Sequence, residues 1–425
     1  MFLYYLYVIL SPFLSFVLYL ISFFNSKVKN NLYHYRQSCQ DAAEKLKNNH
    51  KSVLLFHAAS SGEFEQIQPI LKRIDRNKYF IIQTCTSPTL YNNKNQYKKY
   101  IDVMCYQPFD SIIGSSKYFF KTLNPDLYII TRHDLWPKHI YTAYALNIKI
   151  FFINANVHKR SIWMHSLVLP LSKFLFSKIY FIAAPSSDIK NNLDKISMQL
   201  QAELIPDTRY DQIKDRYEKS MDAPPLLAKK YLKTSNIIFG SIDTEDFHLI
   251  AKALSHAYPQ GSQTLKKDNI QLLLVPHEPN ATMIKLITEK LKSLNFDYTL
   301  LTNDQSLDFN DATVLIVDKV GILAELYKYA KLAYVGGGFT RGVHSVIEPA
   351  IYDCIISYGP NIEMLAEAKE LVNQKISHLI SNINDLVNFI KLINNTKHIT
   401  QSSRKYIMSQ SSSSNQIIQS IYDVF

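Results

Sequence analysis

The chain has 425 residues, 47% of them hydrophobic, which is enough to bury more than one core and excludes a disordered or fibrous protein. Its net charge of +11 and pI of about 9.1 favour polyanionic partners: nucleic acid, an anionic membrane surface or a phosphorylated small molecule. The four cysteines lack CxxC spacing, which argues against a disulfide framework or zinc site and predicts buried thiols in a reducing compartment. They are Cys39, Cys85, Cys105 and Cys354.

The first 26 residues carry no charged side chain and are rich in Leu, Phe, Tyr, Ile and Val. Such a run is long enough to cross a bilayer, so we predict a transmembrane anchor over 1–26. A cleaved signal peptide is the alternative, but the segment has no early Lys or Arg and no small-residue cleavage site follows it. Basic residues dominate the next stretch: Lys27, Lys29, Arg36, Lys45, Lys47 and Lys51, against Asp41 and Glu44. The positive-inside rule therefore predicts a single-pass membrane protein with cytoplasmic domains near anionic headgroups.

Beyond residue 50, short apolar runs alternate with amphipathic stretches, the pattern of βα units that build a parallel sheet. Helices are predicted at Glu63–Ile74 and Ile112–Leu123. The strands of this first series are predicted at Val53–Phe56, Tyr79–Thr84, Asp126–Ile130, Ile148–Asn154 and Tyr180–Ala184.

A second βα series follows a charged stretch, 211–235, that contains Pro224 and Pro225. Its strands are predicted at Ile237–Gly240, Gln271–Val275, Val314–Val317, Leu332–Val335 and Ile355–Tyr358. Its helices are predicted at Glu245–Leu254, Ala281–Leu291 and Gly321–Tyr329. The expected fold is α/β, with two Rossmann-like, doubly wound domains facing across a cleft. We predict domains at 27–210 and 236–400, a linker at 211–235 and a C-terminal helix at 401–425.

Ligands of doubly wound sheets lie beyond the carboxyl ends of the strands, so we sought polar residues there. The first strand ends in the sequence HAASSGE, residues 57–63, which places Glu63 in the first turn of the next helix. A carboxylate there can take a proton from an attacking hydroxyl. The alternative role for Glu63 is to complement the helix dipole.

In the second domain, Gly336, Gly337 and Gly338 close a strand before a helix predicted to begin near His344. Glycines let the backbone approach a ligand, and the amides of a helix start suit a phosphate, although such a turn also simply permits a sharp bend. Glu348, four residues after His344, could accept hydrogen bonds from ribose hydroxyls or remain solvated.

His277, after another strand of this domain, could contact a phosphate or a base, and Arg209 could hold an anionic donor; structural and surface roles are the alternatives. The sequence has no GxxxxGK[ST], HExxH, GxSxG or CxxC motif, which argues against P-loop, zincin, serine hydrolase and dithiol chemistry. Residues Ser161–Lys178 are predicted as a membrane-contacting helix or, equally, as an ordinary buried helix.

Taken in order, these segments resemble the Kdo transferases, inverting GT-B glycosyltransferases that move Kdo from CMP-Kdo onto the lipid A precursor in lipopolysaccharide biosynthesis. The resemblance spans nearly the whole chain, including the anchor. It is carried by 57–63, Pro108–Phe109–Asp110, Leu135–Trp136–Pro137, Asn154–Ala155, Arg160–Ser161, Arg209–Tyr210–Asp211, Asp318–Gly337 with Gly321 and Tyr327, and Glu348–Pro349–Ala350.

The resemblance implies that Glu63 is the general base and that Arg209 stabilises the transition state. It implies no metal and no cofactor, because CMP-Kdo is a donor substrate. The partners that it implies for the protein are CMP-Kdo, lipid IVA and the anionic inner leaflet of the inner membrane. The implied CMP contacts are Pro276, His277, Gly321, Ile322, Leu323, Ser345, Val346, Ile347 and Glu348.

The sequence departs from the family pattern at several positions. Arg132 stands where the family has a catalytic carboxylate, and Lys138 ends a motif that in the family ends in Asn. His277 and Asn156 each replace an Arg, and Ser345–Val346 replaces Asn-Pro. The alternatives are therefore a GT-B transferase or epimerase with another nucleotide sugar, or a non-catalytic membrane-bound binder. Nucleic-acid binding is not expected, because the chain has no recognisable module for it.

Overall fold

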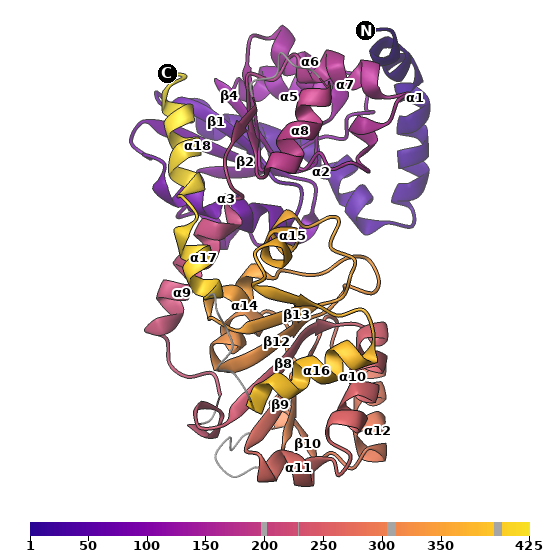
Figure 1. The fold of residues 1–425 in the computed structure, drawn as a ribbon. Helices are drawn as coiled ribbons and strands as arrows, with labels where there is room; N and C mark the ends of the chain where they lie inside the picture. Colours follow the sequence, from indigo (N-terminus) through magenta and orange to yellow (C-terminus); the bar gives the residue numbers. More distant parts are fainter. Residues whose placement is uncertain (197–201, 228, 304–311, 395–401) are drawn as a thin grey trace. The chain divides into compact units, whose positions relative to one another are not determined.

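The computed structural model describes residues 1–196, 202–227, 229–303, 312–394 and 402–425 (Figure 1). The described chain forms two compact units. The N-terminal unit comprises residues 1–212 and 411–425, and the C-terminal unit comprises residues 213–410.

The N-terminal unit is built on a seven-stranded sheet with the order β3-β2-β1-β4-β5-β6-β7, in which all neighbours are parallel. The order reverses between β1 and β4, which pair with His57 beside Ile130. The strands are β1 (Ser52–His57), β2 (Tyr79–Cys85), β3 (Val103–Tyr106), β4 (Leu127–Thr131), β5 (Lys149–Ile153), β6 (Phe181–Ala184) and β7 (Ala202–Leu204).

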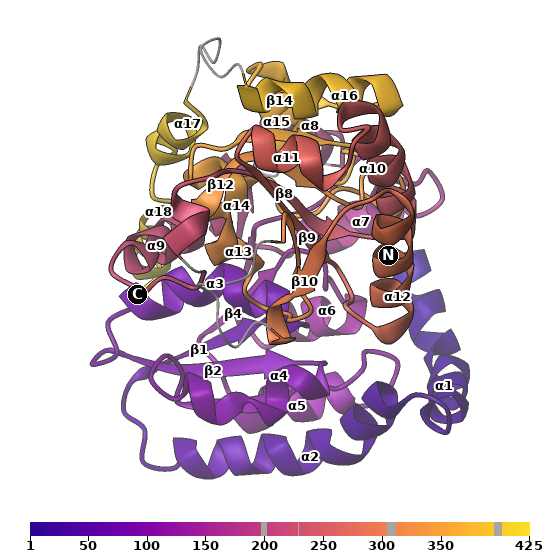
Figure 2. The ribbon, with the colours of Figure 1, turned by 90° about the horizontal axis from the view of Figure 1, so that it is seen from below.

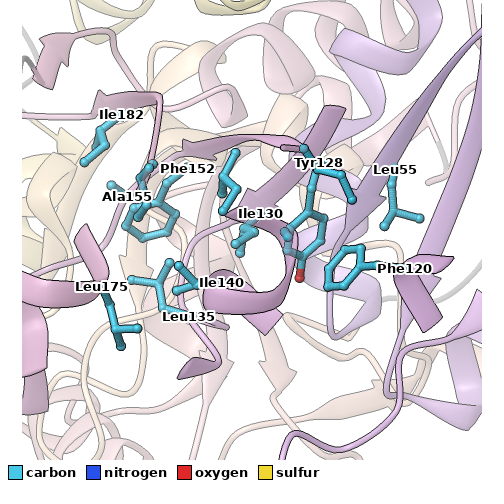
Figure 3. Close-up of a cluster of buried hydrophobic side chains, with 14 of the residues drawn as sticks. Leu55, Phe120, Tyr128, Ile130, Leu135, Ile140, Phe152, Ala155, Leu175 and Ile182 are labelled. Carbon is cyan, nitrogen blue, oxygen red and sulfur yellow. The ribbon is translucent and has the colours of Figure 1, made fainter. Parts of the chain in front are cut away.

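Both faces of this sheet are buried, because successive residues of a strand point to opposite sides. Leu55 and Ile130 belong to one apolar cluster, shown in Figure 3, and Leu54 and Ile129 belong to the other. The helices of this unit are α3 (Ser61–Arg73), α4 (Pro88–Asn92), α5 (Ser115–Leu123), α6 (Pro137–Ala145), α7 (Leu169–Phe176), α8 (Ser187–Ile196) and α18 (Ser413–Tyr422), with 3-10 turns η1 (Lys94–Tyr97) and η2 (Ile162–Met164).

Two long helices precede the sheet. Helix α1 (Phe2–Ser22) is long and apolar enough to cross a membrane, and no other helix in the described part of the chain is. Its Tyr4 is buried against the rings of Tyr141 and Phe174, at centroid distances of 4.6 and 5.5 Å. Helix α2 (Ser26–Leu46) begins at the side-chain cap of Asn25 and lies against β3 and α5 (Figure 2).

The C-terminal unit is built on a second seven-stranded parallel sheet, with the order β10-β11-β9-β8-β12-β13-β14. Its strands are β8 (Ser235–Ile242), β9 (Ile270–Pro276), β10 (Tyr298–Leu300), β11 (Val314–Ile316), β12 (Ala330–Val335), β13 (Ile355–Tyr358) and β14 (Ser377–Leu379). Its helices are α10 (Thr244–Ala257), α11 (Ser262–Lys267), α12 (Ala281–Ser293), α13 (Leu323–Leu326), α14 (Ile347–Ile351), α15 (Ala366–Asn373), α16 (Ile383–Lys391) and α17 (Ser403–Ser409), with 3-10 turns η3 (Lys229–Leu232), η4 (Leu301–Asn303), η5 (Tyr327–Tyr329) and η6 (Leu392–Asn394).

The structure confirms the predicted α/β class and the strands of both series, and it adds the short strands β3, β7, β10 and β14. The described cysteines are all buried thiols, as predicted. Residues 211–235 include most of helix α9 (Arg209–Met221) and the turn η3, and the described part of 401–425 forms two helices, α17 and α18. Residues 161–178 are not one helix, because η2 and α7 are separate.

Candidate functional site

The first cluster of polar residues follows β1 and β4, where the strand order of the N-terminal unit reverses. Glu63 lies in the first turn of α3, whose N-cap Ser60 accepts a hydrogen bond from the Glu63 amide at 3.4 Å. The Glu63 side chain is 9% exposed, and its Oε2 accepts a 2.7 Å hydrogen bond from the amide of Ala59. Glu63 thus both caps the turn and stands as a nearly buried carboxylate beyond the carboxyl end of β1.

The surroundings of Glu63 favour its protonated form. Burial raises the pKa of its carboxyl, and the negative charge of Asp134 raises it further. His57, the amide of Ala59 and Arg132 oppose that shift without cancelling it. A carboxylate with a raised pKa is a stronger base than an ordinary glutamate, which suits proton abstraction near neutral pH.

His57 links this carboxylate to the loop after β4. Its imidazole is fully buried, with Nδ1 2.9 Å from Thr84 Oγ1 and Nε2 3.1 Å from Asp134 Oδ2. Burial alone would raise the pKa of Asp134, but the hydrogen bond from His57 and the charge of that ring hold it below its ordinary value. Asp134 is therefore the ionised carboxylate of the pair, which helps to keep Glu63 basic.

Arg132 and His133 complete the loop after β4. Arg132 adopts a left-handed backbone conformation, φ 66°, and its Nε donates a 3.0 Å hydrogen bond to His133 Nε2. Burial and the charge of Arg132 lower the pKa of His133 to about 4, so this imidazole is neutral at pH 7. Arg132 is therefore the positive group of this loop, where the family resemblance places a carboxylate.

Arg209 begins α9, within the N-terminal unit. Its Nη2 lies 3.2 Å from Asp207 Oδ2, so the guanidinium is paired with its own neighbour. The segment is fixed by Thr208, whose hydroxyl donates to the carbonyl of Gln66 in α3 at 2.5 Å and accepts from Asn154 at 2.9 Å. These bonds tie the start of α9 to the helix that carries Glu63.

Two motifs of the family resemblance meet at the start of α6. Asp110 is 6% exposed and accepts hydrogen bonds from the amides of Lys138 and His139 at 3.0 and 2.9 Å, so it caps that helix. The ring of Phe109 stacks on Trp136 at 5.9 Å. Sequence reasoning did not assign these roles, because the capping residue comes from a distant segment.

The C-terminal unit contains a pocket of about 800 Å³ at the carboxyl ends of its strands. His277 follows β9 and His344 follows the glycine turn after β12, and their rings stack at a centroid distance of 4.3 Å. Both line the pocket with Gly337. Burial and the charge of His277 lower the pKa of His344.

The glycine turn is held by a buried carboxylate that the sequence analysis did not single out. Asp246, in α10, accepts hydrogen bonds from the amides of Gly337 and Asp243 at 2.7 and 3.1 Å and from the Tyr334 hydroxyl at 2.7 Å. Burial raises its pKa to about 6, against these three donors. The capping pattern of Asp243 and Asp246 marks a helix start in the sequence, but only the fold brings β12 to it.

Other predicted nucleotide contacts do not line this pocket in the described part of the chain: Pro276, Gly321, Ile322, Leu323, Gly336, Gly338, Ser345, Val346, Ile347 and Glu348. The helix predicted to begin near His344 begins at Ile347 and is short, so His344 and Glu348 do not share a helical face. Glu348 instead lines a separate cavity of about 10 Å³ with Arg216 and Tyr352. Among the described residues, no group of His, Cys, Asp or Glu side chains could hold a metal ion.

Comparison with known proteins adds to this geometry. A family model described as 3-deoxy-D-manno-octulosonic-acid transferase (kdotransferase) matches residues 29–212. A 3-deoxy-D-manno-octulosonic acid transferase of Aquifex aeolicus is 27% identical over 340 residues, which are 78% of this chain and 82% of the relative. One of Chlamydia muridarum is 26% identical over 335 residues, 76% of this chain and 74% of the relative.

Among solved structures, a UDP-GlcNAc 2-epimerase of Neisseria meningitidis superposes with a TM-score of 0.60 at 13% identity and covers 88% of this chain and 100% of its own. At that identity the likeness concerns the fold. The two doubly wound sheets have a GT-B-like fold, and these relatives are Kdo transferases. The resemblance to the Kdo transferase family is thus confirmed over most of the chain.

Proposed function

We propose that the protein transfers Kdo from CMP-Kdo to a lipid A precursor such as lipid IVA, as a step of lipopolysaccharide biosynthesis. The observation that carries the proposal is the buried carboxylate of Glu63, placed after β1 in the segment that matches the Kdo transferase family model. A base is what an acceptor hydroxyl needs in order to attack a sugar carbon, and no metal is required for that step.

In the proposed reaction, the carboxylate of Glu63 takes the proton of the acceptor hydroxyl. The hydroxyl oxygen forms a bond to the anomeric carbon of the donor, and the bond from that carbon to the phosphate oxygen breaks. CMP leaves with the electron pair. The cations proposed to stabilise the departing phosphate are Arg209 and Arg132, which takes the place of the carboxylate expected from the resemblance.

The nucleotide is assigned to the pocket of about 800 Å³ in the C-terminal unit. Its volume lies within the range of about 300–1,000 Å³ usual for small-molecule sites. The stacked rings of His277 and His344 offer hydrogen-bond donors to a phosphate or a flat surface to a base. Gly337 lets the backbone come close to the ligand. We further propose that α1 attaches the protein to the cytoplasmic face of the inner membrane.

The test is incubation of the purified protein, in vesicles, with CMP-Kdo and lipid IVA, with the product identified by mass. The expected product is the acceptor heavier by one or more Kdo units. Titration calorimetry with CMP, UDP and GDP separates this proposal from a transferase or epimerase with another donor, because CMP should bind most tightly. Absence of product together with preferential UDP binding would refute the Kdo assignment.

A further inference from the structure

A groove of about 360 Å³ lies within the N-terminal unit, between α1 and the loops that follow β3 and β4. The groove is lined by Leu14, Val17 and Leu18 of α1, by Phe109 and Trp136 of the loops and by Pro137 at the start of α6, with Tyr7, Asp110 and Ser111 as its polar residues. The lining is predominantly apolar. The groove is therefore suited to a ligand without charge along its length.

The walls of the groove are held together by hydrogen bonds along one face of α1. The hydroxyl of Tyr7 donates to Asp110 at 2.8 Å, and that of Ser15 donates to the carbonyl of Ser111 at 2.7 Å. Lys138 is 7% exposed, and its Nζ donates to Ser11 Oγ at 3.3 Å. Lys138, which departs from the family motif, thus binds α1. Together these hydrogen bonds hold α1 against the loops that line the groove.

The groove adjoins the polar cluster through Trp136. The ring of Trp136 stacks on Phe109 in the groove wall and meets the ring of His57 edge to face at 6.2 Å. His57 in turn binds Asp134, whose charge acts on Glu63. Trp136 is thus shared between the groove and the polar cluster that contains the group proposed to activate the acceptor.

The other face of α1 indicates where such a molecule comes from. Ile9, Phe13 and Phe16 are 72%, 66% and 57% exposed, and they form part of a helix apolar enough for a membrane. An apolar surface of this kind is typical of membrane contact. The same helix lines the groove with Leu14, Val17 and Leu18, so hydrocarbon in the groove would lie against the helix that contacts the membrane.

We propose that the groove binds an acyl chain of the lipid acceptor and thereby brings the acceptor hydroxyl to Glu63. The inference rests on the proposed function, and it names the recognition element for that substrate: hydrocarbon held between α1 and the Phe109–Trp136 pair. The contact of Trp136 with His57 favours the acceptor over bulk phospholipid as the occupant, because the acceptor, unlike phospholipid, must bring a hydroxyl to the base in this cluster.

The first test fills the groove with Val17→Trp and uses Ile9→Trp, on the exposed face of the same helix, as the matched control. In vesicles of phosphatidylethanolamine and phosphatidylglycerol, kcat/KM is measured for lipid IVA and for its fully deacylated form. We expect the ratio of the two values to fall about tenfold in Val17→Trp and to stay within twofold of wild type in Ile9→Trp. An unchanged ratio in a folded Val17→Trp protein overturns the proposal.

The second test needs no variant. Lipid IVA with a diazirine at the end of one acyl chain is photolysed with the wild-type protein, and the labelled peptides are sequenced. The label is expected on Leu14, Val17 or Leu18 of α1, or on Phe109 or Trp136. It should be displaced by unlabelled lipid IVA but not by excess phospholipid. Label confined to the exposed face of α1, or displaced by phospholipid, overturns the proposal. Failure of sugar transfer with this label intact would refute the proposed function alone.

Discussion

The two units differ in the residues that follow their strands at the point where the strand order of the sheet reverses. Each has a parallel sheet whose strand order reverses at its centre, between β1 and β4 in one and between β8 and β12 in the other. At the first reversal the chain presents the side chains of His57, Glu63 and Asp134. At the second it presents glycine backbone: a Cβ on Gly240 would lie 2.2 Å from the Tyr327 hydroxyl, and one on Gly336 would lie 2.3 Å from the Ser241 carbonyl.

This difference suits the N-terminal unit to proton transfer and the C-terminal unit to nucleotide binding. A crevice at the reversal is the usual ligand site of a doubly wound sheet, and the residues after the strands decide its use. Titratable side chains with opposed pKa shifts suit proton transfer, whereas exposed amides and small residues suit a bound nucleotide. The comparison therefore predicts that variants of the N-terminal cluster change turnover and that variants of the glycine turn change binding.

The largest expected effect is at Glu63. We expect Glu63→Gln to lower kcat by about 10²–10⁴, because an amide cannot take the acceptor proton. CMP affinity in the C-terminal unit should stay within about twofold of wild type, as measured by calorimetry. The matched control is Glu65→Gln, an exposed position two residues further along α3. Equal loss of turnover in both variants would remove Glu63 from its proposed role.

The pH dependence sharpens this test. Because the pKa of Glu63 is raised, its carboxylate is protonated at a higher pH than an ordinary glutamate. The kcat/KM of wild type should therefore fall on the acid side with an apparent pKa above about 4.3, the value for a free glutamate. The small residual activity of Glu63→Gln should lack that acid limb.

A smaller effect is expected at Asp246. Asp246→Ala leaves the amides of Gly337 and Asp243 and the Tyr334 hydroxyl without their acceptor, so we expect a loss of about 2–4 kcal/mol in the free energy of unfolding. CMP binding should weaken with it, because the turn is no longer held. Urea unfolding and calorimetry measure the two effects. A fully stable Asp246→Ala protein would contradict the proposed support of the turn.

The isosteric Asp246→Asn variant separates charge from shape. The folded pKa of Asp246 is about 6, above the ordinary 3.8, so the folded state holds this proton more tightly than the unfolded state. Its contribution to stability is present at low pH and is lost as pH rises from about 4 to about 6, by on the order of 3 kcal/mol. We expect the difference in unfolding free energy between wild type and Asp246→Asn to change with that sign.

The smallest effect is expected at Gly337, which lies at φ +86° and whose added Cβ would meet the Gly342 carbonyl at 2.6 Å. Gly337→Ala should weaken CMP binding about tenfold, since a strained backbone of this kind costs on the order of 1–3 kcal/mol. Gly62→Ala is the control in the other unit, because an added Cβ there meets no atom within 4 Å. Its CMP affinity should equal that of wild type.

Much of the fold was predictable from local sequence. Apolar runs such as Leu54–Phe56 are fully buried, because both faces of a parallel sheet are covered. A continuous apolar run therefore predicts a strand even when the neighbouring strand is not known. The edge strands β10 and β14 were missed because they are short and only partly buried, so their apolar signal is weak. The helix expected after the glycine turn begins later than predicted, because the chain first turns back through Gly342, φ 125°, and the amide of His344 donates to the carbonyl of Gly336.

The sequence by itself determined the βα order, the apolar N-terminal helix and the position of Glu63 after a strand, because these depend on neighbours within a few residues. Tertiary structure alone decided that Asp134 faces His57, that Asp110 caps α6, that Asp246 holds Gly337 and that α1 closes a groove with Trp136. Each of these pairs joins segments that meet only when the sheet is assembled, and burial then fixes both their hydrogen bonds and their charge states.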